Sequence, residues 1–232
     1  MQTGSAAPAQ RRRLLRALAG GALGCAVPAA AAQLLGKTPH ELPAGQSIYD
    51  LRGQVTVDGA AATPETLISA NATIATGARA QLIFVVGKDA FLLRENSTLA
   101  LAGSKAVVQT LRLLTGALLS VFGKGEHQLV VPTATVGIRG TGIYAEAQAE
   151  LCYLCTCYGI VDINATGTAQ SERIEAKHHD DPRYIASSGD ARIRSAPMIN
   201  HTDEELLLIE TLVGRVPPFA LIDDGYGRSR RY

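Results

Sequence analysis

The residues best suited to chemistry in this sequence are cysteines, three of which fall within six positions. Cys152, Cys155 and Cys157 form a C-x2-C-x-C pattern. The histidines that could complete a site with them lie downstream and are His178, His179 and His201. Three thiolates and one imidazole would make a tetrahedral Cys3His site, as zinc prefers. Soft thiolates also suit copper(I) or an iron–sulfur cluster, so the pattern predicts a metal site without naming the metal.

Two interpretations without a metal compete with this one. In an oxidising compartment, two of the three cysteines could form a disulfide and leave the third as a buried free thiol. Alternatively, all three could be inert thiols of the core. Only three cysteines would remain in the mature chain after removal of an export signal that contains Cys25, and an odd number is unusual for a plain disulfide protein, which favours the metal without excluding the others.

Strand geometry limits which of these side chains can meet. Side chains alternate along a strand, so Cys155 and Cys157 would share one face, and Gly159 and Val161 would continue that face. Cys152 has the opposite parity and would need a turn or a bulge to join them. The neighbouring side chains of His178 and His179 would diverge in an extended segment.

The composition excludes several classes of function. A net charge of +1 is too balanced for a nucleic-acid binder that depends on a basic surface. The sequence contains no Ser/His/Asp arrangement, no paired-carboxylate motif and no phosphate-cradling glycine loop, so we expect no enzyme. A thiol-redox or cluster-carrying protein that uses the cysteine motif is the alternative. The C-x2-C spacing, however, normally acts where a strand enters a helix.

The N-terminal residues 1–32 have the pattern of a cleaved export signal. Basic residues Arg11-Arg12-Arg13 precede a short apolar segment, and small residues end at Ala32. The arginine pair and the low hydrophobicity indicate the Tat route, with an ordinary Sec signal as the alternative. A lipid anchor at Cys25 is a further alternative, although the residues before it fit a lipobox poorly. We therefore expect a periplasmic protein without a membrane span in the mature chain, after a linker at 33–45.

The next part of the chain, residues 46–165, is rich in short apolar and β-branched runs that recur about every ten residues. Glycine-bearing turns separate these runs. The expected strands include Val55–Val57, Thr66–Ile68, Gln81–Val86, Ala90–Leu93, Thr98–Leu101, Leu111–Leu114, Ala117–Phe122 and Gln128–Val131. No run of helical length interrupts them, so the pattern predicts an all-β fold, an antiparallel sandwich or roll.

Residues 166–232 differ in composition and are expected to form a C-terminal extension with a polar tail. Glu172–Ala176 is a further expected strand. One α-helix is predicted at about 203–213, because Thr202 and Glu205 form a capping box. Apolar residues at helical spacing follow, and Gly214 suits the position after the helix end.

The run Pro132–Thr141, PTATVGIRGT, resembles the FecR domain, the periplasmic sensory part of ferric-citrate-type regulators. The resemblance covers roughly 46–165. It implies a non-enzymatic sensory or binding module that contacts a cell-envelope protein or ligand, which the sequence does not identify. The motif glycines allow close backbone approach. Arg139 lies between them, and we expect it either to pair with a carboxylate of the fold or to contact the ligand.

The resemblance stops short of the family archetype at the N-terminus. Archetypal regulators have a cytoplasmic anti-sigma segment and a membrane span before this domain. Here only residues 1–16 precede the apolar segment of the signal. We therefore do not expect anti-sigma activity.

Overall fold

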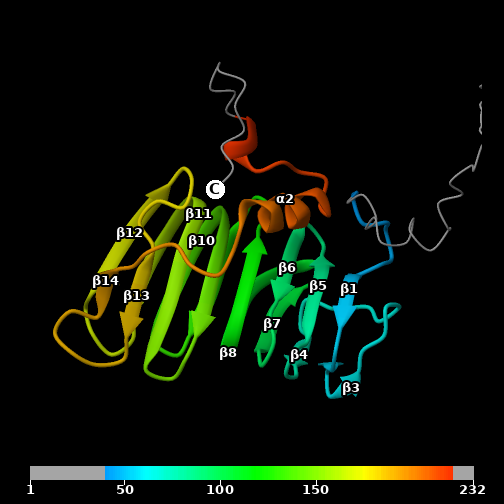
Figure 1. Cartoon of the computed structure of the whole chain (residues 1–232), viewed down its shortest axis with the longest axis horizontal. Helices are drawn as coiled ribbons and strands as arrows, with labels where there is room; N and C mark the ends of the chain where they lie inside the picture. The colour runs from blue at the N-terminus through cyan, green and yellow to red at the C-terminus, as the bar shows by residue number, and fades with distance from the viewer. Residues whose placement is uncertain (1–39, 222–232) are drawn as a thin grey trace, which may run out of the picture. The chain divides into compact units, whose positions relative to one another are not determined.

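The computed structural model describes residues 40–221, and most of this part of the chain is β-sheet (Figure 1). The strands are β1 (Ile48–Arg52), β2 (Val55–Val57), β3 (Ala60–Ala61), β4 (Thr73–Thr76), β5 (Gln81–Val86), β6 (Asp89–Leu93), β7 (Thr98–Ser104), β8 (Val107–Val121), β9 (Glu126–Val131), β10 (Ala134–Ala147), β11 (Leu151–Ala165), β12 (Ser171–Ala176), β13 (Arg183–Ala186) and β14 (Ile193–Ser195). One α-helix, α2 (Asp203–Thr211), and a 3-10 helix, η1 (Pro218–Leu221), follow them in the described residues.

All of these strands belong to one sheet, which confirms the predicted all-β class. Its main path runs β14-β13-β11-β10-β9-β8-β7-β4-β2-β3. Neighbouring strands pair antiparallel, with the single exception of the parallel pair β8 and β9 among the described residues. The predicted helix is confirmed to within two residues at its C-terminal end.

A bend in β8 lets this strand serve two parts of the sheet. Its first half pairs with β7 and β9, and its second half pairs with β6 and β10. Gly116 lies at the bend with φ +84°, and a Cβ there would lie 2.0 Å from Oγ of Ser97. Only glycine fits this conformation and this close approach. The two strands predicted at Leu111–Leu114 and Ala117–Phe122 are therefore one strand with a glycine bend.

The sheet has apolar residues on both faces. One face forms the larger core, which contains Leu99, Leu111, Val136 and Ile163. The other face carries a smaller apolar cluster that includes side chains of β6, β8, β10 and β11 together with Leu206, Ile209 and Leu212. The helix α2 thus covers the second face (Figure 1). Strands buried on both sides explain why β6 and much of β11 are continuously buried.

The expected strand at Thr66–Ile68 is absent, and this prediction was wrong. The amide of Thr66 donates to the Thr63 carbonyl at 2.9 Å, and the amide of Thr63 donates to Oγ1 of Thr66 at 2.9 Å. These local bonds close a turn and compete with strand pairing. Leu67 is 65% exposed, and Ile68 is buried in the larger core from this turn without strand pairing.

The sheet continues beyond Ala165 into the expected C-terminal extension. Strands β12 and β13 both pair with β11, and β14 pairs with β13. The predicted strand at Glu172–Ala176 is confirmed as β12. The expected export signal and most of the linker lie outside the described residues. Between residues 40 and 221, no helix combines the length and apolar character needed to cross a membrane.

Candidate metal centre

The strand β11 sends its cysteines to different faces of the sheet. Cys155 and Cys157 belong to the cluster beneath α2, whereas Cys152 is buried in the larger core on the opposite face. This is the separation that strand parity predicts. The expected continuation of the Cys155 face through Val161 is wrong, because Val161 lies in the larger core. The pairing of β11 with β10 shifts at Tyr158, and Gly159 has φ +93°, so a bulge reverses the alternation.

The loop between β12 and β13 brings His179 over Cys157. The His179 amide donates to the carbonyl of Cys157 at 2.8 Å. The carboxylate of Asp180 accepts the amides of Lys177 and His178 at 2.7 and 3.2 Å, which closes the loop. His179 has φ +54°, a left-handed conformation that is costly for a residue with a Cβ. The loop is therefore not extended, and the rings of His178 and His179 lie 4.8 Å apart instead of diverging.

The segment before α2 places His201 against the same cysteines. Its ring stacks on Tyr144 with centroids 4.6 Å apart, and its Nδ1 lies 2.6 Å from the Ile199 carbonyl. Thr202 is the N-cap of α2 and accepts the Glu205 amide, while the Glu205 carboxylate accepts the Thr202 amide. This capping box fixes where the helix begins and hence where His201 lies.

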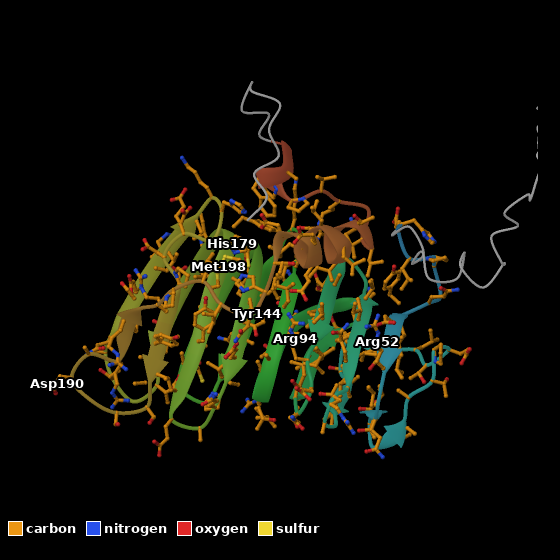
Figure 2. All side chains as sticks on the ribbon, viewed as in Figure 1. Arg52, Arg94, Tyr144, His179, Asp190 and Met198 are labelled. Atoms are coloured by element: carbon orange, nitrogen blue, oxygen red, sulfur yellow. The ribbon has the colours of Figure 1, made fainter. Side chains whose placement is uncertain are left out.

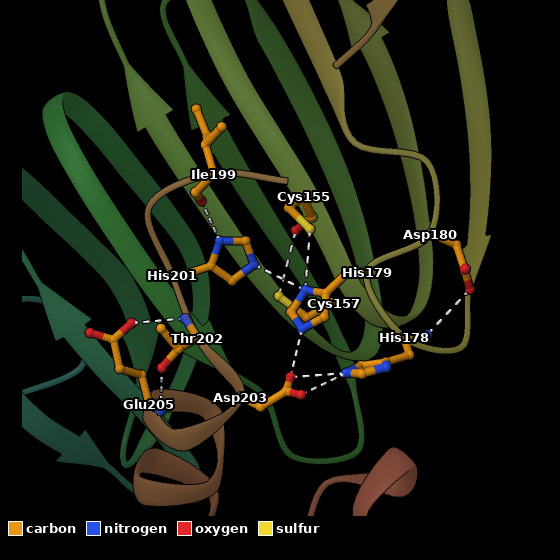
Figure 3. A network of polar contacts seen from close by, with 10 residues as sticks. All are labelled: Cys155, Cys157, His178, His179, Asp180, Ile199, His201, Thr202, Asp203 and Glu205. Atoms are coloured by element: carbon orange, nitrogen blue, oxygen red, sulfur yellow. Dashed lines mark hydrogen bonds and ion pairs between the residues drawn. The ribbon is translucent and has the colours of Figure 1, made fainter. Parts of the chain in front are cut away.

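Four side chains converge at this point, namely Cys155, Cys157, His179 and His201 (Figure 3). One donor atom from each lies within 4.8 Å of all the others. Sγ of Cys155 is 3.5 Å from Nδ1 of His179, and the latter is 3.0 Å from Nε2 of His201. Ligands of one tetrahedral zinc ion would be separated by about 3.5 Å for sulfur and nitrogen and about 3.3 Å for two nitrogens. The observed spacing therefore fits a single ion.

The hydrogen bonds of the two imidazoles leave their inner nitrogens without hydrogens. Nε2 of His179 faces the carboxylate of Asp203 at 2.9 Å, and Nδ1 of His201 faces the Ile199 carbonyl. Both partners are acceptors, so the nitrogens that face them must carry hydrogen. In neutral rings, Nδ1 of His179 and Nε2 of His201 would then be two lone pairs facing each other at 3.0 Å. A shared metal ion satisfies both, and so does a proton on one ring.

The electrostatics of the group favour a thiolate and a protonated imidazole when no metal is bound. A hydrogen bond from Cys157, with further bonds from His179 and His201, lowers the pKa of Cys155 to about 4. Burial raises the pKa of Cys157, and the neighbouring Cys155 thiolate adds to this effect. Burial by itself would lower the pKa of His179, but Cys155 and Asp203 raise it above its ordinary value.

His178 and Asp203 form an outer layer around the four donors. Nε2 of His178 lies 2.9 Å from Oδ1 of Asp203, and its ring stacks on Phe219 with centroids 4.4 Å apart. His178 is half-exposed, with 41% of its side chain in solvent, whereas the side chain of His179 retains 6%. A carboxylate behind a ligating histidine orients the ring and raises its basicity. Asp203 is placed for that role, which the sequence alone did not indicate.

Cys152 does not join the group. It is fully buried in the core on the other face, and its Sγ donates to the Gln148 carbonyl at 3.4 Å. The structure thus brings together Cys155, Cys157, His179 and His201 as donors, with His178 beside them and Cys152 apart. The donor set is Cys2His2 where the sequence predicted Cys3His.

Arg139, the other predicted site residue, lies in the first half of β10 and is exposed. Its guanidinium approaches the Asp162 carboxylate at 3.9 Å, and its side chain is 57% exposed. It lines a shallow polar cleft together with Glu126, Gln128 and Asp162. Acidic and basic groups are mixed in this cleft, so a weak surface pair describes Arg139 best.

Sequence reasoning also missed the sheet residues that hold His201. Tyr144 supplies the stacking surface, and its hydroxyl donates to Glu146 at 2.7 Å. Arg94 donates to the Asn200 carbonyl at 2.9 Å and pairs with Glu205. Arg94 and Tyr144 therefore meet the segment before α2 from the sheet side (Figure 2). Their sequence spacing to His201 gives no signal of this contact.

The fold and the site together define an all-β protein with a closed Cys2His2 donor group beneath a C-terminal helix. No family model matches the chain. No curated protein matches it either. Among solved structures, two crystal structures of a Parabacteroides distasonis protein provisionally described as an anti-sigma factor are similar, with a TM-score of 0.44 and 10% identity. The alignment covers 53% of this chain and 58% of that one, so the chain spans little more than half of its length.

Proposed function

We propose that this protein is an exported, non-enzymatic sensory or binding module of FecR type that holds one zinc ion through Cys155, Cys157, His179 and His201. The FecR-like part of the proposal rests on the Pro132–Thr141 motif. Export to the periplasm rests on the signal pattern in residues 1–32. The envelope protein or ligand that the module contacts is left to experiment.

One observation carries the metal proposal. Nδ1 of His179 and Nε2 of His201 face each other at 3.0 Å while the outer nitrogen of each ring is bound to an acceptor. This is the arrangement of two imidazoles that share an ion and are oriented by a second layer. The two cysteines beside them are fully buried, and burying two sulfur donors with two nitrogen donors suits a structural tetrahedral site.

The donor set and its spacing argue against an iron–sulfur cluster, one of the options that the sequence left open. Two cysteines and two histidines can also hold a [2Fe–2S] cluster, but there they bind different irons. Ligands of two irons would lie farther apart than the 3.5 Å between Cys155 and His179. Four protein donors around one position leave no open coordination site, which fits structural zinc and gives no place for a substrate.

A thiol-redox function draws on one observation, the low pKa of Cys155 beside His179. A reactive thiolate needs access to its partner as well as a low pKa. Cys155 and Cys157 are both 0% exposed and lie beneath the segment that carries His201. The geometry therefore favours a metal ligand over a redox thiol.

The test is metal analysis of the protein purified anaerobically, with thiol counting in parallel. We expect one zinc per chain in the wild type and in Cys152→Ser, which alters a buried cysteine on the other face. We expect a large loss of zinc in Cys157→Ser. Absence of zinc from the wild type, or equal zinc loss in Cys152→Ser, would contradict the proposal.

A further inference from the structure

The four donors come from two parts of the structure that are far apart in the sequence. Cys155 and Cys157 lie on β11, and His179 is bound to that strand through its amide and the Cys157 carbonyl. These three are therefore held on the sheet, two by β11 itself and His179 by a loop bonded to β11. His201 alone comes from the segment that crosses the second face and leads into α2 (Figures 1 and 3). An ion bound to all four donors would join this segment to the sheet.

The segment at 196–214 covers a surface that would otherwise be exposed and apolar. Beneath it lie Tyr144, Tyr153 and Tyr158, all at least 95% buried. Polar contacts hold it at several points: the Tyr153 hydroxyl donates to the Pro197 carbonyl at 2.9 Å, and Tyr158 donates to Glu210. The Glu210 carboxylate also accepts from Arg215 at 2.6 Å. The segment is thus docked by packing and hydrogen bonds, including the stacking of His201 on Tyr144, and a bound metal ion would add one more connection through His201.

We propose that metal occupancy controls how readily segment 196–214 opens from the sheet, with His201 as the ligand that fastens it. This inference rests on the proposed zinc site. With the ion bound, opening must break one metal–nitrogen bond and expose the ion. Without the ion, only packing and hydrogen bonds hold the segment, so the tyrosine face beneath it is uncovered more often. The site then converts the presence of a metal into the accessibility of a surface.

Thermodynamic linkage between zinc binding and closure of the segment gives a second, independent test. If zinc favours the closed segment, then closure must favour zinc by the same factor. A substitution that weakens the packing of α2 without touching a donor must therefore weaken zinc binding. Ile209 is fully buried on the inner side of α2 and is not a donor, and Ile74 on β4 is equally buried in the larger core. Ile209→Val and Ile74→Val form a matched pair, and each removes one methylene.

The test is amide hydrogen exchange of the full chain, with and without one equivalent of zinc, read by mass spectrometry over 199–213 and over β4. We expect zinc to slow exchange at least tenfold in 199–213 and to leave β4 unchanged. In His201→Ala, three donors stay on the sheet, so we expect weaker zinc binding and no slowing at 199–213. We expect Ile209→Val to lower zinc affinity several-fold and Ile74→Val to leave it unchanged.

The outcomes separate this inference from the proposed function. Stoichiometric zinc with unchanged exchange in 199–213 would overturn the inference and leave the zinc site standing. The same holds if His201→Ala keeps the zinc-dependent slowing, or if Ile209→Val binds zinc as tightly as Ile74→Val. If the wild type binds no zinc, the proposed function fails and the inference fails with it.

Discussion

Nδ1 of His179 and Nε2 of His201 lie 3.0 Å apart, and both rings also contact the thiol group of Cys155. The outer nitrogens of both rings are already directed at acceptors, Asp203 and the Ile199 carbonyl. Two imidazoles oriented in this way need a cation between them, either a proton or a metal ion. The predictions below distinguish these two states.

The first prediction concerns Asp203, which orients the ring of His179. Asp203→Asn keeps the shape of the side chain but removes the charge that supports the imidazole N–H. We expect zinc affinity to fall by about 10- to 100-fold, as for other second-layer carboxylates. Competition with a chelator of known affinity measures it. Glu204→Gln is the control, because it removes a charge from the same helix turn without facing a histidine. Equal effects of both variants would assign the loss to the helix dipole alone.

The second prediction concerns pH and His179 in the zinc-free protein. The pKa of His179 is raised from 6.5, so its protonated form stabilises the folded state. This contribution is complete below the unfolded value of 6.5 and is lost as the pH rises through the raised folded pKa. His179→Gln should therefore cost more free energy of unfolding at pH 6 than at pH 8.5, as measured by denaturant titration.

Zinc should reverse this dependence. The metal needs the unprotonated Nδ1 of His179, so acid competes with zinc and lowers its apparent affinity. The zinc-loaded wild type should therefore lose its metal, and the stability that comes with it, as the pH falls. A zinc-loaded protein whose stability at pH 6 matches that at pH 8.5 would contradict a site built on His179.

The third prediction concerns Gly137, in the motif that resembles the FecR domain, and Gly142, which directly follows that motif. A Cβ at Gly142 would lie 2.6 Å from the Tyr158 ring, beneath α2. A Cβ at Gly137 would meet nothing closer than 3.8 Å, and its φ is not left-handed. Gly142→Ala should lower the free energy of unfolding by about 1–3 kcal/mol, because a packed ring must move. Gly137→Ala should have little effect. Thermal unfolding compares the two variants. An equal loss of stability in both would contradict the prediction, because it would mean that the Tyr158 ring can move aside without a measurable loss.

Local sequence signals predicted much of this fold. Alternating apolar runs and glycine turns gave the strands, and the Thr202–Glu205 capping box gave the start of α2. Parity correctly separated Cys152 from Cys155 and Cys157. These features depend on neighbours within a few residues, which is why the sequence alone reveals them.

The predictions that failed concern features that depend on contacts between distant segments. The bulge at Tyr158 reversed the expected face of Val161, because pairing with β10 shifts there. The approach of His178 and His179 depends on the left-handed conformation of His179. The sequence carries no sign of it, because no glycine marks that position. The docking of His201 on Tyr144 follows from the path of the chain over the second face. Donor identity could thus be predicted from the sequence, but the choice of two cysteines and two histidines could not.

The most direct test of the central claim is X-ray absorption at the zinc edge on the metal-loaded protein. Two sulfur neighbours at about 2.3 Å and two nitrogen neighbours at about 2.0–2.1 Å are expected for the Cys155, Cys157, His179 and His201 site. In His201→Ala, one nitrogen neighbour should be lost and both sulfurs retained. A spectrum with three sulfurs, or with only light-atom neighbours, would contradict the account.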